Sequence, residues 1–83
     1  MYKLLHFTAD WCVPCQKSKP LVNKFVEENN VDYQVIDIDR EFHTAGMYEV
    51  KSIPTFISLK DGKYYERHVG VPTDSILKKI LDI

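Results

Sequence analysis

The pattern of apolar and polar positions predicts alternating strands and helices over the first half of the chain. Residues 2–8, YKLLHFT, are a short run rich in strand-forming side chains. From residue 12 to about residue 30, apolar side chains recur at helical spacing among lysines and glutamates. Pro20 lies inside this predicted helix, where its missing backbone donor should produce a kink. Residues 31–38, VDYQVIDI, carry apolar side chains on both faces, which is typical of a central strand covered on both sides.

A short helix and a hairpin are predicted to follow. Asp39 is a candidate cap for a helix that ends before Ile53-Pro54. Three of that helix's side chains should face inward: Phe42, Ala45 and Tyr48. The runs 55–60 and 63–69 flank Asp61-Gly62, a dipeptide that supplies the positive φ angles of a type I′ turn. They therefore predict an antiparallel hairpin.

A closing helix completes the predicted order. After the strand breakers Gly70 and Pro72, Thr73 is a candidate N-cap. Four apolar side chains then fall on one helical face: Ile76, Leu77, Ile80 and Leu81. The order is βαβαββα, an α/β class, and its first βαβ unit should have a right-handed crossover with two parallel strands. No repeat or linker interrupts the pattern, so we expect one domain over residues 1–83.

Composition narrows the range of functions. The chain has 83 residues, 45% of them hydrophobic, and its 11 basic and 12 acidic side chains leave a net charge of -1. The sequence has no basic block, which argues against a nucleic-acid footprint or a polybasic membrane anchor. Its apolar runs are far shorter than the ~18 residues of a membrane span, and its N-terminus does not resemble a signal peptide. We therefore expect a soluble, cytoplasmic monomer with no nucleic-acid or membrane partner.

The sequence WCVPC at positions 11–15 joins the first strand to the first helix. Helical geometry places two residues three apart with their Cα atoms ~5 Å apart, within the range that a disulfide tolerates. Cys12 lies at the exposed start of the helix, where free backbone donors and the helix dipole stabilise a thiolate, so it is the expected nucleophile. Pro14 in the first turn should stiffen the segment between the sulfurs.

An inert buried cysteine pair and half of a zinc site are the alternatives to redox chemistry. A structural zinc site needs four ligands, and the remaining candidates are single, scattered histidines: His6, His43 and His68. A CxxC pair beside a βαβ pattern is a redox signature. We therefore favour redox chemistry, with no metal.

The segment FTADWCVPC, followed by Ile53-Pro54-Thr55, Asp61-Gly62 and Gly70, resembles the thioredoxin family over nearly the whole chain. The resemblance implies a four-stranded mixed sheet with helices on both faces. Relative to the full-length family fold, the sequence begins at the strand before the active site and so is similar to the minimal, glutaredoxin-sized form.

The resemblance also assigns roles to individual residues. It implies that Cys12 attacks, that Cys15 resolves, and that the pair forms a redox-active disulfide. It further implies a cis peptide bond before Pro54, although most X-Pro bonds are trans. The substrate-binding residues implied are Trp11, Val13, Pro14, Ile53, Pro54 and Gly70, among which Trp11 shields the pair and Gly70 admits a substrate backbone.

The chain departs from the family pattern beside the cysteines. Relatives carry a buried acid six residues before the first cysteine, where this chain has His6, and Val35 stands about where a lysine often accompanies that acid. His6 is either a candidate catalytic residue that carries a proton or a hydrogen-bonded core residue. Val13 replaces a usual glycine and Thr8 a common tryptophan, changes that bear on the choice of reductase and substrate.

These features predict a thiol-disulfide oxidoreductase, an electron carrier that reduces protein disulfides and is re-reduced by a thioredoxin reductase. No metal or tightly bound organic cofactor is implied. Two alternatives remain open: a glutaredoxin-like reductase that draws electrons from glutathione, and a binding subunit that uses the fold without turnover. A glutaredoxin would more typically have proline directly after the first cysteine, whereas here Pro14 precedes the second.

Overall fold

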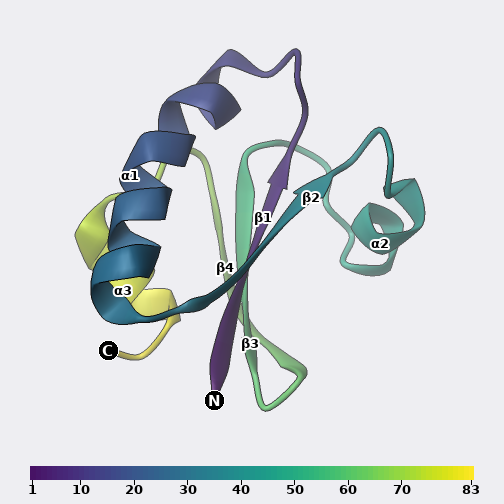
Figure 1. Ribbon diagram of the computed structural model, residues 1–83. Helices are drawn as coiled ribbons and strands as arrows, with labels where there is room; N and C mark the ends of the chain where they lie inside the picture. Colours follow the sequence, from purple (N-terminus) through teal and green to yellow (C-terminus); the bar gives the residue numbers. More distant parts are fainter.

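Three helices and four strands make up the computed structural model, which describes residues 1–83 (Figure 1). In chain order they are β1 (Tyr2–Thr8), α1 (Val13–Asn29), β2 (Asp32–Asp37), α2 (Phe42–Met47), β3 (Thr55–Lys60), β4 (Lys63–Val69) and α3 (Asp74–Ile80). The predicted order βαβαββα is confirmed. None of the helices has the length and apolar character that crossing a membrane would require.

The strands form one mixed sheet in the order β2-β1-β3-β4. β1 runs parallel to β2 and antiparallel to β3, and β3 pairs antiparallel with β4. Parallel pairing of β1 and β2 follows from the α1 crossover between them, and antiparallel pairing of β3 and β4 follows from their two-residue turn. β1 is an inner strand with β2 on one side and β3 on the other. The segment that follows β1 in the sequence therefore begins in the middle of the sheet edge.

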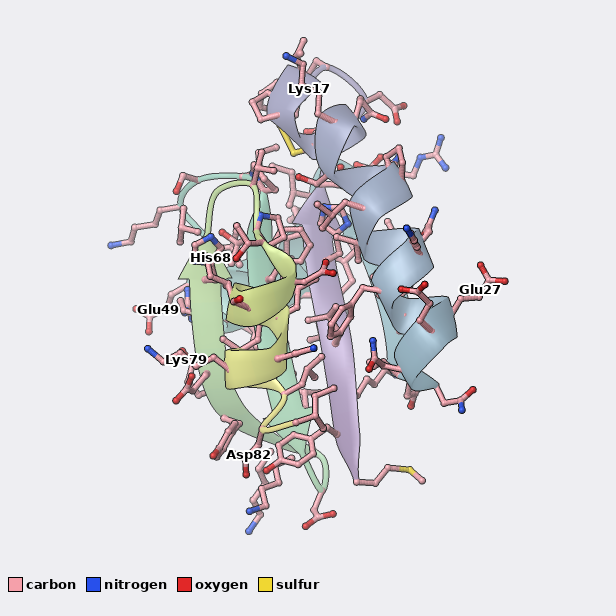
Figure 2. All side chains as sticks on the ribbon, turned by 90° about the vertical axis from the view of Figure 1, so that its left-hand side faces the viewer. Lys17, Glu27, Glu49, His68, Lys79 and Asp82 are labelled. Atoms are coloured by element: carbon pink, nitrogen blue, oxygen red, sulfur yellow. A yellow bond between two sulfur atoms is a disulfide. The ribbon has the colours of Figure 1, made fainter.

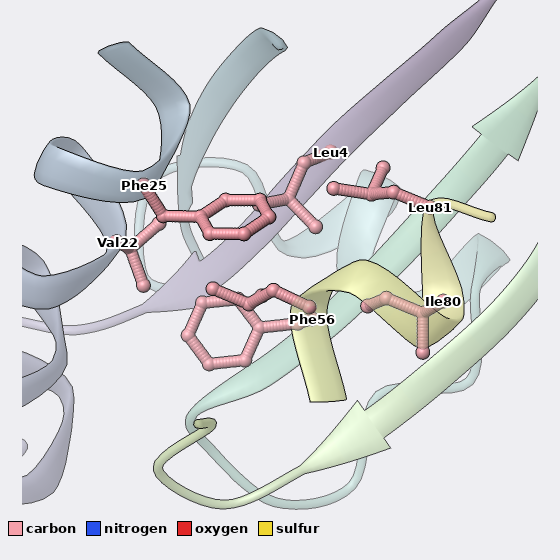
Figure 3. Close-up of a cluster of buried hydrophobic side chains, with 7 residues drawn as sticks. Leu4, Val22, Phe25, Phe56, Ile80 and Leu81 are labelled. Carbon is pink, nitrogen blue, oxygen red and sulfur yellow. The ribbon is translucent and has the colours of Figure 1, made fainter. Parts of the chain in front are cut away.

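Alternation along β1 divides the core into two layers. On one face Leu4 joins side chains of α1, β3 and α3 in a cluster drawn in Figure 3: Leu4, Val22, Phe25, Phe56, Leu77, Ile80 and Leu81. On the other face a second cluster contains Leu5, Phe7, Ile36, Ala45, Ile57 and Leu59. Thus α1 and α3 cover one face and α2 the other, as expected of a sheet with helices on both faces (Figure 1).

The prediction that residues 31–38 form a central, doubly covered strand is wrong. β2 lies at the edge of the sheet, and of its six residues only Ile36 is fully buried. Val35 stays 43% exposed. Ile36 packs in the cluster on the side of the sheet that α2 covers, and Tyr33 is partly buried on the side that α1 covers. These two contacts account for the apolar run, and the strand as a whole is not buried on both sides.

The start of α2 also differs from expectation. Glu41 occupies the N-cap position without a side-chain cap bond, and Asp39 lies two residues before it. Ala45 is buried and Tyr48 packs against the α2-side cluster, but Phe42 is 64% exposed. Because α2 has only six residues, only a narrow face of it packs against the sheet. Phe42, in the first turn, does not lie on that face.

The hairpin and the closing helix agree with the sequence. Asp61 and Gly62 have φ angles of 52° and 82°, the positive pair that a type I′ turn requires. Thr73 caps α3 by accepting a hydrogen bond from the Ile76 backbone N–H at 3.2 Å. Of the four apolar residues predicted to face inward, Leu77, Ile80 and Leu81 are buried.

We expect Thr73→Ala to lower the free energy of unfolding by about 1 kcal/mol, the usual cost of deleting a side-chain N-cap. The change leaves one backbone donor of α3 without its protein partner. Urea denaturation of the wild type, Thr73→Ala and Thr73→Ser would measure it. Serine retains the acceptor oxygen, so an equal loss in the serine variant would contradict the capping role.

Candidate active site

The two cysteines meet where β1 passes into α1. Cys12 is the N-cap residue of α1 and is disulfide-bonded to Cys15, with the two Cα atoms 5.2 Å apart. This agrees with the ~5 Å expected from helical spacing. Figure 2 shows the sulfur pair at the end of the sheet where α1 begins. Pro14 lies in the first turn of the helix, where its missing N–H breaks no helical bond.

Cys12 is less exposed than the sequence led us to expect. Cys12 retains 5% exposure and Cys15 none. Together with Ala9 they form a small apolar cluster, against which Ile38 and Ile53 pack. The exposed fractions of the two cysteines therefore differ by only a few per cent, and Cys12 is the one that reaches the surface in the disulfide form.

Hydrogen bonds at Cys12 and Ala9 hold the start of α1 in place. The Cys15 N–H donates to the Cys12 Sγ at 3.2 Å, an N-cap hydrogen bond in which sulfur replaces the usual oxygen. The Cys12 N–H donates to the Ala9 carbonyl at 3.1 Å, and the Gln16 side-chain amide donates to the same oxygen at 3.0 Å. These bonds fix the Cys12 sulfur over the N-terminus of α1, where negative charge is stabilised.

Trp11 extends from the pair over a hollow. Its indole Nε1–H donates to Asp39 Oδ2 at 2.9 Å, while its side chain remains 66% exposed. The ring lines a hollow of about 230 Å³, whose other walls are Ile38, Val50, Lys51, Ser52 and Ile53. Asp39, which the sequence suggested as a helix cap, therefore orients the indole instead.

The peptide bond between Ile53 and Pro54 is cis, as the resemblance implied. Ile53 packs against the cluster that contains both cysteines, so the segment before β3 is brought to the disulfide. The Thr55 hydroxyl donates to the Ser52 carbonyl at 2.6 Å and fixes this turn. The Gly70 N–H donates to the Pro54 carbonyl at 2.8 Å and ties the end of β4 to the same place.

Gly70 has a φ of +105°, a conformation that residues with a Cβ rarely adopt. A Cβ there would come no nearer than 4.0 Å to the His68 ring, so space does not impose the choice of glycine. The backbone angle imposes it. The structure thus places Gly70 beside Pro54, and Val13, 62% exposed, at the start of α1.

His6 is fully buried on the face of β1 that α1 covers. Its ring stacks on Phe56 with centroids 4.3 Å apart, and its Nδ1 lies 3.0 Å from the Tyr33 hydroxyl. His6 Nε2 and the Thr8 hydroxyl on the same face have no hydrogen-bond partner in the protein. Burial, aided by the positive charge of Lys19, lowers the pKa of His6 to about 4. His6 is therefore neutral at physiological pH.

Sequence reasoning missed two partners of the site residues. Tyr33 holds His6, and Asp39 holds Trp11. Tyr33 reaches His6 because β1 and β2 pair Leu4 with Tyr33, which places the tyrosine diagonally beside His6. No group of three or more His, Cys, Asp or Glu side chains is arranged to hold a metal ion.

Comparison with known proteins agrees with this geometry. The family model Thioredoxin matches residues 2–82. A thioredoxin of Chlamydia trachomatis is 42% identical over 79 residues, covering 93% of this chain and 78% of that protein. The crystal structure of a thioredoxin from Nicotiana alata superimposes with a TM-score of 0.89 at 38% identity, covering 98% of this chain and 71% of that one. The chain belongs to the thioredoxin family, and its fold is thioredoxin-like.

Some relatives are considerably longer than this chain. A TPR repeat-containing thioredoxin of Arabidopsis thaliana is 36% identical over 78 residues, covering 93% of this chain. The chain spans 20% of that protein and 59% and 64% of two other matching proteins of the same plant. The similarity to these proteins therefore covers only part of their length.

Proposed function

We propose that this protein is a thiol-disulfide oxidoreductase that reduces disulfides in other proteins. The observation that carries the proposal is the Cys12–Cys15 disulfide at the N-terminus of α1, with the Cys15 N–H directed at the Cys12 sulfur. A sulfur so placed is stabilised as a thiolate in the reduced protein, and the thiolate is the nucleophile of disulfide exchange.

The reaction proceeds in two exchanges. The Cys12 thiolate attacks one sulfur of the substrate disulfide, and the substrate's other sulfur leaves as a thiolate that takes a proton from water. Cys15 then loses its proton and attacks the Cys12 sulfur, which releases the second substrate sulfur. Two electrons pass to the substrate, and the Cys12–Cys15 disulfide forms. The chain needs no other cofactor for these steps.

Substrate binding should be shallow and should use the main chain near Ile53. This residue packs against the cysteine cluster, and Gly70 leaves the neighbouring surface free of a side chain. An extended substrate segment pairing there brings its disulfide to the Cys12 sulfur, in the manner of strand addition. The hollow beside Trp11 accommodates an apolar side chain of the substrate.

A thioredoxin reductase is the proposed electron donor, and the protein acts as a cytoplasmic, monomeric electron carrier in redox homeostasis. The proposal can be tested with a coupled NADPH assay with insulin as substrate. One arm contains a thioredoxin reductase and the other contains glutathione with glutathione reductase. NADPH consumption in the first arm alone supports the proposal. Consumption in the second arm alone identifies a glutaredoxin-like protein, and consumption in neither, with dithiothreitol also failing to support insulin reduction, identifies a binding subunit.

His6 gives a further prediction about the thiol equilibrium. A buried carboxylate near the thiols would oppose thiolate formation once it is ionised, whereas the neutral imidazole of His6 does not. We therefore expect wild type to be more oxidising than His6→Asp at neutral to alkaline pH. Equilibration of both proteins with a thiol buffer, combined with titration of the Cys12 thiolate, would measure the difference.

His6→Asn serves as the matched control, because asparagine is neutral and retains a polar atom close to the position of Nδ1. Its potential should stay near that of wild type, while that of His6→Asp falls. If His6→Asp folds but has an unchanged or more oxidising potential, His6 acts only as a core residue. That result would leave the exchange reaction of the two cysteines unaffected.

A further inference from the structure

The chain between α2 and β3 carries part of the cysteine site and contains little regular structure. After α2 ends at Met47, residues 48–54 lead to the cis bond at Pro54. Residues 50–53 form one wall of the hollow beside Trp11, and Ile53 contacts the cysteine cluster. The position of this segment therefore determines the shape of the proposed substrate surface.

The first turn of the segment adopts an unfavourable backbone conformation. Glu49 has a φ of 53°, which is uncommon for a residue with a Cβ. The Glu49 N–H donates to the Gly46 carbonyl, and the Val50 N–H donates to the Ala45 carbonyl. These bonds close the end of α2 in the way that glycine usually allows. They leave the carbonyls of Tyr48 and Glu49 without helical donors.

Arg67 supplies donors to both of these carbonyls. Its Nη2 donates to the Tyr48 carbonyl at 2.5 Å and its Nη1 to the Glu49 carbonyl at 3.4 Å. Its Nε donates to the Tyr64 hydroxyl at 3.0 Å, and the guanidinium lies 5.3 Å from the centroid of the Tyr64 ring. The guanidinium is thus held on β4 while it binds the end of α2. Figure 2 shows Glu49 on the flank of β4.

Strand register explains why Arg67 reaches this place. Arg67 lies opposite Ile57 in the antiparallel pair, and side chains of such a pair point to the same face of the sheet. Ile57 belongs to the cluster on the α2 side. Three residues later on the same chain, the Gly70 N–H binds the Pro54 carbonyl. The end of β4 therefore holds the segment 48–54 at both of its ends.

We propose that Arg67 is a positioning residue for the segment that binds the substrate. Through the Tyr48 and Glu49 carbonyls it sets where the chain leaves α2, and so where Val50 to Ile53 lie against Trp11 and the cysteines. Its hydrogen bonds go to Tyr64, Glu49 and Tyr48 and not to the cysteines. This role rests on the proposed function, since it concerns the surface that receives a protein disulfide.

The test compares Arg67→Lys and Arg67→Met with wild type on two oxidants. For insulin, whose chain must pair beside Ile53, we expect KM to rise about tenfold with kcat nearly unchanged, because charge-assisted hydrogen bonds that order the segment are lost. Lysine retains the charge but cannot donate to both carbonyls in the fixed geometry of a guanidinium. For dithiobis(2-nitrobenzoate), a small disulfide that does not need the segment, the rate should be unchanged.

Tyr64→Phe is the matched control, because it removes only the partner of the Arg67 Nε and leaves the two carbonyl bonds. Its KM for insulin should rise less than that of either Arg67 variant. Amide hydrogen exchange gives a readout that does not depend on activity. In the Arg67 variants the protected amides of Glu49 and Val50 should exchange about tenfold faster, while amides within β1 should not change.

The outcomes separate this proposal from the proposed function. If wild type is active and both Arg67 variants have an unchanged KM for insulin, the positioning role is overturned while the proposed function stands. An equal loss of rate with both oxidants would also overturn it, because that indicates general damage to the fold. If wild type itself fails to reduce insulin, the proposed function fails, while faster exchange at Glu49 and Val50 still reports the hold of Arg67 on the segment. Unchanged exchange in both variants would overturn that hold.

Discussion

Replacing Cys12 with serine is expected to reduce insulin reduction to the background rate, whereas replacing Cys15 with serine is expected to trap the protein on its substrate. Cys12 retains 5% exposure and its sulfur accepts the Cys15 N–H, so we expect Cys12 to make the first attack. Cys15 is fully buried, so we expect it to act on the Cys12 sulfur afterwards. Without Cys15 the mixed disulfide has no internal route to release.

The two variants should therefore differ in kind as well as in activity. Non-reducing gels and mass spectrometry of the Cys15→Ser protein, incubated with insulin, should detect a covalent adduct through Cys12. The Cys12→Ser protein should form much less adduct. Alkylation of the reduced wild type at neutral pH provides a separate check, and faster labelling of Cys15 than of Cys12 would reverse the two roles.

Local patterns in the sequence were sufficient for the elements that depend on neighbouring residues. The turn at Asp61-Gly62 follows from two adjacent residues that tolerate positive φ, and the Thr73 cap follows from a side chain three residues before its donor. The placement of Cys12 and Cys15 follows from helical spacing alone. In each case the physical cause lies within a few residues of the feature.

Features that depend on the order of strands were not predictable in this way. The apolar run of β2 suggested a central strand, but strand order is set by all four strands together and leaves β2 at the edge. Asp39 accepts a hydrogen bond from Trp11, 28 residues before it in the sequence, and Arg67 donates one to Tyr48, 19 residues before it. Such contacts need the register and the faces of the sheet, which hydrophobic periodicity does not contain.

His6 illustrates how the two kinds of information combine. The sequence marks it as unusual, since it is a titratable residue in an apolar strand. Its surroundings come from three strands: β1 itself, Tyr33 on β2 and Phe56 on β3. Those surroundings make it a neutral, buried base with an unpartnered Nε2. Its effect on folding can be derived from this state whatever part it takes in proton transfer.

We expect acid to destabilise the protein through His6. The folded-state pKa of about 4 lies below the ordinary value of 6.5, so between these values the unfolded chain binds a proton that the native protein does not. The unfolding free energy should fall as pH drops from 6.5 to 4, and below 4 this contribution is fully lost. The difference between the folded-state and ordinary pKa values of His6 corresponds to about 3 kcal/mol of unfolding free energy. This is a substantial part of the ~5–15 kcal/mol typical of small domains.

Urea denaturation at a series of pH values would measure this effect, with His6→Asn as the reference. Carboxyl groups such as Asp61, whose pKa is lowered by the N-terminal ammonium group, also cost stability in acid, but they are the same in both proteins and cancel. The wild-type curve should fall more steeply than that of His6→Asn between pH 6.5 and 4. Parallel curves, or an NMR titration of His6 near its ordinary pKa in the folded protein, would refute the argument. A steeper wild-type curve would show that the fold keeps the His6 imidazole neutral and therefore loses stability in acid. This loss is expected because His6 is buried against Phe56 and Tyr33, with no carboxylate partner for its charged form.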